Sequence, residues 1–122
     1  MLNILAVGAG GFIGAVLRYL IGLVHISETL IFPIKTFIIN VIGCIVIGAI
    51  ALVTIKNVQM SSQMLLFLKV GLCGGFTTFS TFALETADLM KAGHTGAALM
   101  YVLLSVLVGI GVIFTIEYLS IK

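Results

Sequence analysis

Charged side chains are scarce in this sequence. Lys, Arg, Asp and Glu make up 8% of the 122 residues, whereas a soluble domain carries about a quarter. Because 61% of the residues are hydrophobic, there is no polar surface with which a soluble core could be covered. The lipid bilayer is therefore the expected solvent, and a net charge of +2 is far too dilute for nucleic acid binding.

Cysteine is also rare. Cys44 and Cys73 both lie in apolar stretches, and neither has a second Cys or a His at the spacing of a metal site. We therefore expect two free thiols that pack as small hydrophobic side chains. The sequence offers no nucleophile–base pair or metal cluster, which makes an enzyme the least favoured class. The N-terminus lacks the basic segment and cleavage site of a signal peptide, so we take it as mature structure.

Four apolar runs meet or approach the roughly 20 residues that a membrane-spanning helix needs. They cover residues 4–24, 36–55, 63–91 and 95–116. Pro33, the only proline, stands just ahead of the second run, where the start of a helix tolerates it. The sequence therefore predicts an all-α integral membrane protein, with a single domain of four transmembrane helices over residues 1–122.

The third run contains a segment that is poorly suited to a helix. GGFTTFSTFALE, residues 74–85, combines the adjacent Gly74 and Gly75 with the adjacent Thr77 and Thr78, and both residue types have weak helix propensity. In lipid, irregular backbone is tolerated only where protein or a water-filled cavity surrounds it, and broken helices in transporters bind ions at such places. We predict a helix to about Leu72, a non-helical stretch over residues 74–78 at mid-membrane, and a second helix from Phe79. The alternative is an intact helix with a glycine-rich packing face.

Basic residues do not favour either side of the membrane. With four crossings, one side lies nearest Lys56, Lys69 and Lys122, and the other nearest Arg18, Lys35 and Lys91. The positive-inside rule therefore predicts no orientation. A chain that inserts both ways can pair with itself, and four short helices leave little room for an enclosed pathway, so we expect an antiparallel, dual-topology homodimer. The alternative is a small subunit whose orientation is set by one dominant loop.

Polar residues inside the spans indicate where protein or water must lie. Asn40 shares a helical face with Thr36 and Gly43 in the second span. An amide in hydrocarbon costs several kcal/mol unless it is hydrogen-bonded, so Asn40 serves either as interhelical glue or in a pathway. Tyr101 and Ser105 stand one turn apart in the fourth span and add two hydroxyl groups.

Four further features bear on what such a pathway would carry. Gly10 and Gly14 form a GxxxG pattern, which predicts close helix packing. Arg18 either snorkels to the interface or holds anions in an aqueous vestibule. Phe79 and Phe82 project from one helical face, where their electropositive ring edges can line a dry anion path, although ordinary core packing is the alternative. Hydroxyl, amide and ring-edge donors favour a small anion, while carbonyls freed at the break suit a hard cation.

These motifs resemble a known family. The segment 74–85, GGFTTFSTFALE, is similar to the signature of the Fluc (CrcB) fluoride channels, and GGFIGAVLRY at 10–19 and NVIGC at 40–44 are similar to that family's first- and second-span motifs. The resemblance covers essentially the whole chain, including its length and its four spans. It implies a fluoride-selective ion channel that passively exports fluoride from the cytoplasm and lowers its toxicity. The channel would have two antiparallel pores in a homodimer and would lie in the bacterial inner membrane.

The resemblance also implies roles for single residues on the fluoride pathway. Phe79 and Phe82 resemble the aromatic box that fluoride passes, and Asn40 resembles the pore-lining amide. Tyr101 and Ser105 fall where the family has a hydroxyl track on its last span.

A structural cation is implied in the same way. Gly74 and Thr77 resemble the positions whose backbone carbonyls hold a central sodium ion shared by the two subunits.

Gly109 departs from the family, because the next hydroxyl of the track on the last span is missing there. The remaining matches are Thr78 and Ser80 within the motif, Arg18 near the pore entrance, and Glu85 as the acid after the motif.

Two other classes of protein remain open. A small proton-coupled multidrug transporter also has four short spans and dual topology, but it needs an acid in its first span, and this chain has no Asp or Glu before Glu28. A non-catalytic assembly subunit would use its glycines and Asn40 for packing alone. Release of fluoride but not chloride from proteoliposomes would separate a fluoride channel from such a subunit.

Overall fold

The computed structural model describes residues 1–56 and 58–121, and the elements in this part of the chain are all helical. Three crossings are continuous helices: α1 (Leu2–Gly22), α2 (Ile34–Ile55) and α6 (Thr95–Ile121). The third crossing runs from Ser62 to Lys91, and all four are long and apolar enough to span a membrane. The predicted all-α architecture with four crossings is confirmed.

The third crossing is assembled from four consecutive pieces. They are α3 (Ser62–Leu65), the π-helix η1 (Leu66–Cys73), α4 (Gly74–Phe76) and α5 (Phe79–Lys91). The predicted break is present, and the second half begins at Phe79 as expected. Its predicted extent was wrong, because residues 74–76 remain helical and only Thr77 and Thr78 are extended. Of the two glycines that suggested a wider break, Gly75 instead allows close contact with the backbone of Gly11 on α1, since a Cβ atom on Gly75 would lie 3.0 Å from the Gly11 Cα atom, whereas a Cβ atom on Gly74 would meet nothing within 4 Å.

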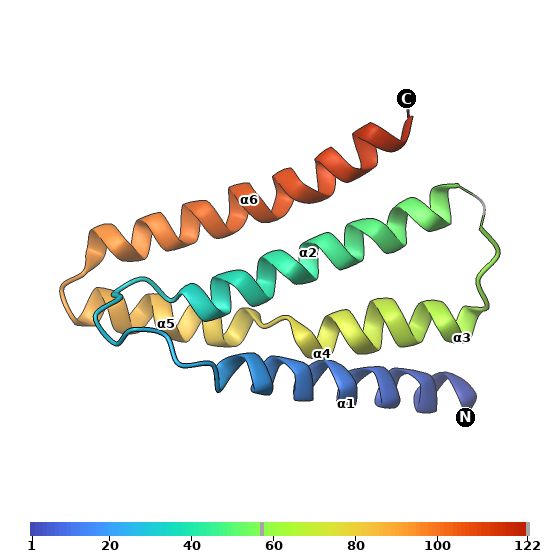
Figure 1. Cartoon of the computed structure of the whole chain (residues 1–122), viewed down its shortest axis with the longest axis horizontal. Coiled ribbons are helices and arrows are strands. Elements are labelled where there is room, and N and C mark those ends of the chain that lie inside the picture. Colours follow the sequence, from blue (N-terminus) through green and yellow to red (C-terminus); the bar gives the residue numbers. More distant parts are fainter. Residues whose placement is uncertain (57, 122) are drawn as a thin grey trace.

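Backbone-to-backbone packing joins α1 to the first half of the third crossing. A Cβ atom on Gly14 would collide with the carbonyl oxygen of Leu72 and would lie 2.7 Å from the backbone nitrogen of Phe76. A Cβ atom on Gly71 would lie 2.8 Å from the Cα atom of Gly10. The close packing predicted from the GxxxG pattern is confirmed, and it places η1 and α4 directly alongside α1 (Figure 1).

The second half of the third crossing packs differently, through side chains. Leu89 on α5 and Ala98 and Tyr101 on α6 form a buried cluster. The ring of Phe32 meets Tyr101 edge to face at a centroid distance of 5.3 Å. Gly93, with a φ angle of 84°, forms the tight turn between α5 and α6, a backbone conformation that glycine adopts without steric cost.

The connections alternate between the two ends of the bundle (Figure 1). The N-terminus, the connector between α2 and α3, and the end of α6 lie at one end. The connectors after α1 and after α5 lie at the other end. This arrangement agrees with four crossings and with the predicted grouping of the basic residues, except for Lys122, which lies outside the described residues. Antiparallel pairing of two copies stays a prediction.

Candidate functional site

The two extended threonines close the helix ends on either side of the break. Thr77 has φ −82° and ψ 159°, and Thr78 has φ −150° and ψ 118°. The Thr77 hydroxyl donates to the Cys73 carbonyl oxygen at 2.7 Å, and the Thr77 backbone N–H donates to the same oxygen at 3.0 Å. The Thr78 hydroxyl accepts from the backbone N–H of Thr81 at 3.2 Å and caps α5.

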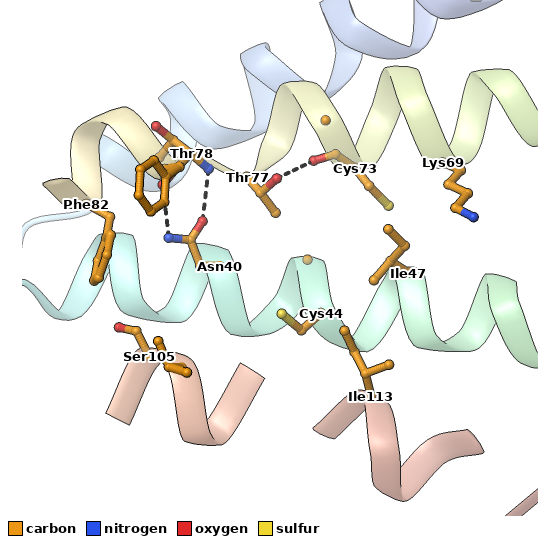
Figure 2. A pocket seen from close by; sticks show the side chains of 14 residues that line it. Asn40, Cys44, Ile47, Lys69, Cys73, Thr77, Thr78, Phe82, Ser105 and Ile113 are labelled. Atoms are coloured by element: carbon orange, nitrogen blue, oxygen red, sulfur yellow. Dashed lines mark hydrogen bonds between the residues drawn. The ribbon is translucent and has the colours of Figure 1, made fainter. Parts of the chain in front are cut away.

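The Asn40 amide holds the break in place from α2. Its Nδ2 donates to the Thr78 carbonyl oxygen at 3.1 Å, and its Oδ1 accepts from the Thr78 backbone N–H at 2.9 Å (Figure 2). The side chain therefore satisfies both backbone groups of a residue that has left the helix. An amide carries two N–H donors, and only one is used in these two bonds; Asn40 also lines the adjoining cavity. Asn40 is thus both interhelical glue and a cavity-lining donor.

A cavity of about 490 Å³ lies beside the break, between the third crossing, α2 and α6 (Figure 2). Its polar lining consists of Asn40, Lys69, Thr77, Thr78 and Ser105. Phe79 and Phe82 also line it, and no Asp or Glu belongs to the described lining. Five of the eight predicted pathway residues therefore meet at one cavity; Arg18, Tyr101 and Ser80 do not line it.

The predicted aromatic pair lies together at this cavity. The ring centroids of Phe79 and Phe82 are 5.7 Å apart, and 79% of Phe79 is exposed. Phe82 is half-buried, because its other side contacts Tyr101 at a centroid distance of 5.0 Å. Tyr101 is fully buried behind Phe82, so it supports the ring.

Ser105 presents a free hydroxyl. Its oxygen is buried and has no hydrogen-bond partner within the described chain. A buried hydroxyl without a partner costs free energy unless a ligand or water bonds to it. Gly109, one turn further on α6, lies close to Cys44, since a Cβ atom on Gly109 would be 3.2 Å from the Cys44 sulfur. The Cys44 thiol therefore lies against α6 at the position where the sequence lacks a hydroxyl.

A second cavity, of about 460 Å³, lies on the other side of the break. Its charged lining residues are Arg18, Lys35 and Glu85, and Thr78 lines both cavities. Arg18 Nε donates to the Gly75 carbonyl oxygen at 3.1 Å, and Lys35 Nζ donates to the Gly22 carbonyl oxygen at 2.8 Å. Arg18 therefore stays within the bundle, beside the break.

Glu85 is a residue whose environment the sequence did not reveal. Its carboxylate accepts hydrogen bonds from the Thr36 hydroxyl at 2.7 Å and from the Tyr101 hydroxyl at 2.8 Å. Asp88, three residues later, instead pairs with Lys91 at 3.6 Å on the surface. Acidic residues at i and i+3 looked alike in the sequence, yet only Glu85 faces α2 and α6. The signal that distinguishes them is the pair of hydroxyl-bearing residues on those two helices.

The backbone carbonyls at the break fall into two groups. Those of Cys73, Gly75 and Thr78 accept hydrogen bonds from neighbouring groups. Those of Gly74 and Thr77 accept none from the described residues. Gly74 is also exposed, and a Cβ atom there would meet nothing within 4 Å. Ser80 is exposed too, with its hydroxyl 3.5 Å from that of Thr78.

Comparison with known proteins gives one consistent result. A family model described as "CrcB-like protein, Camphor Resistance (CrcB)" matches residues 5–116. The chain belongs to the CrcB family. A relative from Oceanobacillus iheyensis is 44% identical over 114 residues, covering 93% of this chain and 88% of the relative. One from Chlorobaculum tepidum is 42% identical over 115 residues, covering 94% and 91% respectively. Both relatives carry the name fluoride-specific ion channel FluC.

The CrcB match covers most of each of the four crossings and includes the residues that line both cavities, so the resemblance drawn from the motifs is confirmed. The structure adds two features that sequence reasoning missed. One is the π-helical geometry of η1, which has no distinctive residue pattern. The other is Lys69, which looked like one more basic residue near an interface but lines the larger cavity.

Proposed function

We propose that this CrcB-family protein is a fluoride-selective channel that lets fluoride leave the cytoplasm passively. The observation that carries the proposal is the larger cavity, which is lined by Asn40 and by Ser105, whose hydroxyl has no partner within the described chain, and by no described carboxylate. Two phenyl rings stand at the same cavity. The name of the relatives supports fluoride as the anion.

The chemistry of the lining suits a small, strongly hydrated anion. To enter, fluoride must exchange its water for hydrogen-bond donors and electropositive ring edges, and it must be bound weakly enough to leave. Asn40 and Ser105 supply neutral donors, and Phe79 and Phe82 supply ring edges. Thr78 lines both cavities, so the break with its Asn40 clamp forms the junction between them. Arg18 and Lys35 would attract anions to the smaller cavity.

The proposed assembly is an antiparallel homodimer with two pores. Its support is the exposed surface near the middle of the third crossing, where Gly74 and Phe79 are exposed and the Gly74 carbonyl accepts no hydrogen bond from the described residues. A free carbonyl facing lipid costs several kcal/mol, so another protein surface is needed there. A second copy inserted in the opposite sense would cover this surface and supply the missing cavity wall.

We further propose a structural sodium ion at the centre of this dimer. The carbonyls of Gly74 and Thr77 fit a hard cation, because both are oxygen ligands without an intramolecular donor. When bound, sodium would place a positive charge between the subunits. These two residues would hold it from each copy.

Passive fluoride export would lower fluoride toxicity in a bacterial cell whose inner membrane holds the protein. Hydrogen fluoride crosses membranes from acidic surroundings and dissociates in the more alkaline cytoplasm. An open anion path then drains the trapped fluoride, since the membrane potential disfavours anions inside.

Fluoride efflux from proteoliposomes tests the proposal. Vesicles loaded with potassium fluoride, with valinomycin to balance the charge, should release fluoride to an external electrode when they contain the protein. Matched vesicles loaded with potassium chloride should retain chloride. Equal release of both anions would overturn selectivity, and release of neither would favour an assembly subunit.

A further inference from the structure

Lys69 is the only charged residue among positions 62–84 of the third crossing. A charged side chain inside the hydrocarbon region is costly unless it is paired or reaches water. Within the described residues Lys69 forms no ion pair, and no hydrogen bond to its ammonium is present. The ammonium group must therefore be hydrated or be close to an anion.

The position of Lys69 in the larger cavity is distinctive. Figure 2 shows its side chain extending from the third crossing into the gap toward α2, at the opposite end of the cavity from Phe82 and Asn40. Between these two ends the lining is largely apolar, with Ile47 and Ile113 among the residues drawn there. The cavity thus has neutral donors at one end and a single full positive charge at the other.

We propose that Lys69 is an anion-recruiting residue, which raises the fluoride concentration at the mouth of the larger cavity on the Ser62 side. This inference rests on the proposed fluoride channel. The neutral donors at the break lie beyond an apolar stretch, so an anion arriving from this side meets no attraction there before Lys69. A fixed positive charge at a low-dielectric mouth raises the local anion concentration and the rate of arrival.

The location of the charge also explains why it does not trap the ion. Lys69 lies away from Asn40 and Ser105, so an anion near the ammonium is not held by all the donors at once. Lys69 affects how fast anions reach the cavity, whereas the donors at the break contact the anion as it passes through. Arg18 and Lys35 are the basic residues that line the smaller cavity, on the other side of the break.

Single-channel current in planar bilayers tests this role. At low fluoride and low ionic strength, we expect Lys69→Gln to reduce fluoride current roughly fivefold and Lys69→Glu by more than about tenfold, because removing or reversing the charge lowers the local anion concentration. Lys69→Arg, which keeps the charge, should restore the current. In about 0.5 M of an impermeant salt the variants should converge, since the screening length falls to ~4 Å.

Lys56→Gln provides the matched control. Lys56 is exposed at the end of α2, at the same end of the bundle, and lines neither cavity. Its loss should leave the current within about twofold of wild type. All variants are compared after size-exclusion chromatography, so that only assembled protein is measured.

The outcomes are distinguishable. If wild-type protein passes no fluoride, the proposed function fails. If wild type conducts and Lys69→Gln conducts equally at low ionic strength, only the recruiting role is overturned, and Lys69 merely snorkels to the interface. Equal losses in Lys69→Gln and Lys69→Arg that persist at high salt would show a packing role and would also overturn the inference.

Discussion

The two halves of the third crossing are built on different principles. The first half, η1 with α4, presses its backbone against α1 through Gly71 and its neighbours, so there is no room for side chains at that contact. The second half, α5, meets α2 and α6 through Phe82, Glu85 and Leu89. Two extended residues and one amide from α2 separate them.

The difference shows how a small membrane protein can combine a rigid frame with a polar site. Close glycine packing needs no polar side chain and holds the first half by van der Waals contact. Because the helix is interrupted at the break, α5 begins as a new helix, and its residues Phe79 and Phe82 line the larger cavity. The glycine contacts with α1 therefore act as scaffold, whereas Lys69 of η1, the break and α5 line the larger cavity. The scaffold and the cavity lining can be disturbed separately.

The largest effect on fluoride efflux is expected from a substitution of Asn40, the residue that bonds to the break. Asn40→Asp keeps an acceptor for the Thr78 N–H but places a negative charge on the anion path and against the Thr78 carbonyl. A repulsion of about 3 kcal/mol at an effective dielectric constant near 20 predicts a roughly hundredfold loss of fluoride efflux. Electrode-monitored efflux measures the change. Asn3→Asp makes the same change outside both cavities and should leave efflux intact.

Equal efflux in Asn40→Asp and wild type would mean that Asn40 acts as glue alone. A loss of assembled protein during chromatography would instead indicate that the clamp is needed for folding.

The next largest effect is expected on stability, from a substitution in the glycine contact between α1 and the third crossing. Gly14→Ala inserts a methyl group where the backbone of Leu72 and Phe76 already lies, and overpacking of this kind costs about 2 kcal/mol. We expect a lower melting temperature in detergent by intrinsic fluorescence. Gly8→Ala, on the same helix but with nothing within 4 Å, should melt like the wild type. A similar melting temperature for both variants would contradict the close packing.

The aromatic pair should show a smaller effect on transport and little effect on stability. Phe82→Ile removes an electropositive ring edge, and a loss of about 1.4 kcal/mol of such interaction corresponds to roughly tenfold slower efflux. Phe79→Ile should act in the same direction, but without loosening the contact with Tyr101. Undiminished efflux in both variants, measured on intact assemblies, would remove the ring-edge argument.

The smallest effect is expected on the outer face of α5. Asp88→Asn breaks an exposed ion pair with Lys91, and surface pairs contribute about 0–1 kcal/mol. Its melting temperature should stay close to wild type, whereas Glu85→Gln, which disturbs the bonds to Thr36 and Tyr101, should lower it. Melting curves of the two variants, measured side by side, test this difference in melting temperature. A lower melting temperature for Asp88→Asn than for Glu85→Gln would contradict the prediction.

Part of the site was readable from the sequence because its cues are local. Apolar runs gave the crossings, and TT followed by a new helical pattern placed the start of α5 at Phe79. The same cues misjudged residues 74–76, since glycine is ambiguous between breaking a helix and packing one. The partner of the Tyr101 hydroxyl could not be predicted, because it is Glu85, a residue on another helix.

The sequence by itself determined that this chain crosses the membrane four times and that its third crossing is interrupted, because hydrophobic length and turn chemistry are properties of neighbouring residues. Only the tertiary structure decided which carbonyls stay free, that Asn40 clamps Thr78, and that Lys69 lines a cavity. Those outcomes depend on which helices meet and at what distance, and residues far apart in the chain set them.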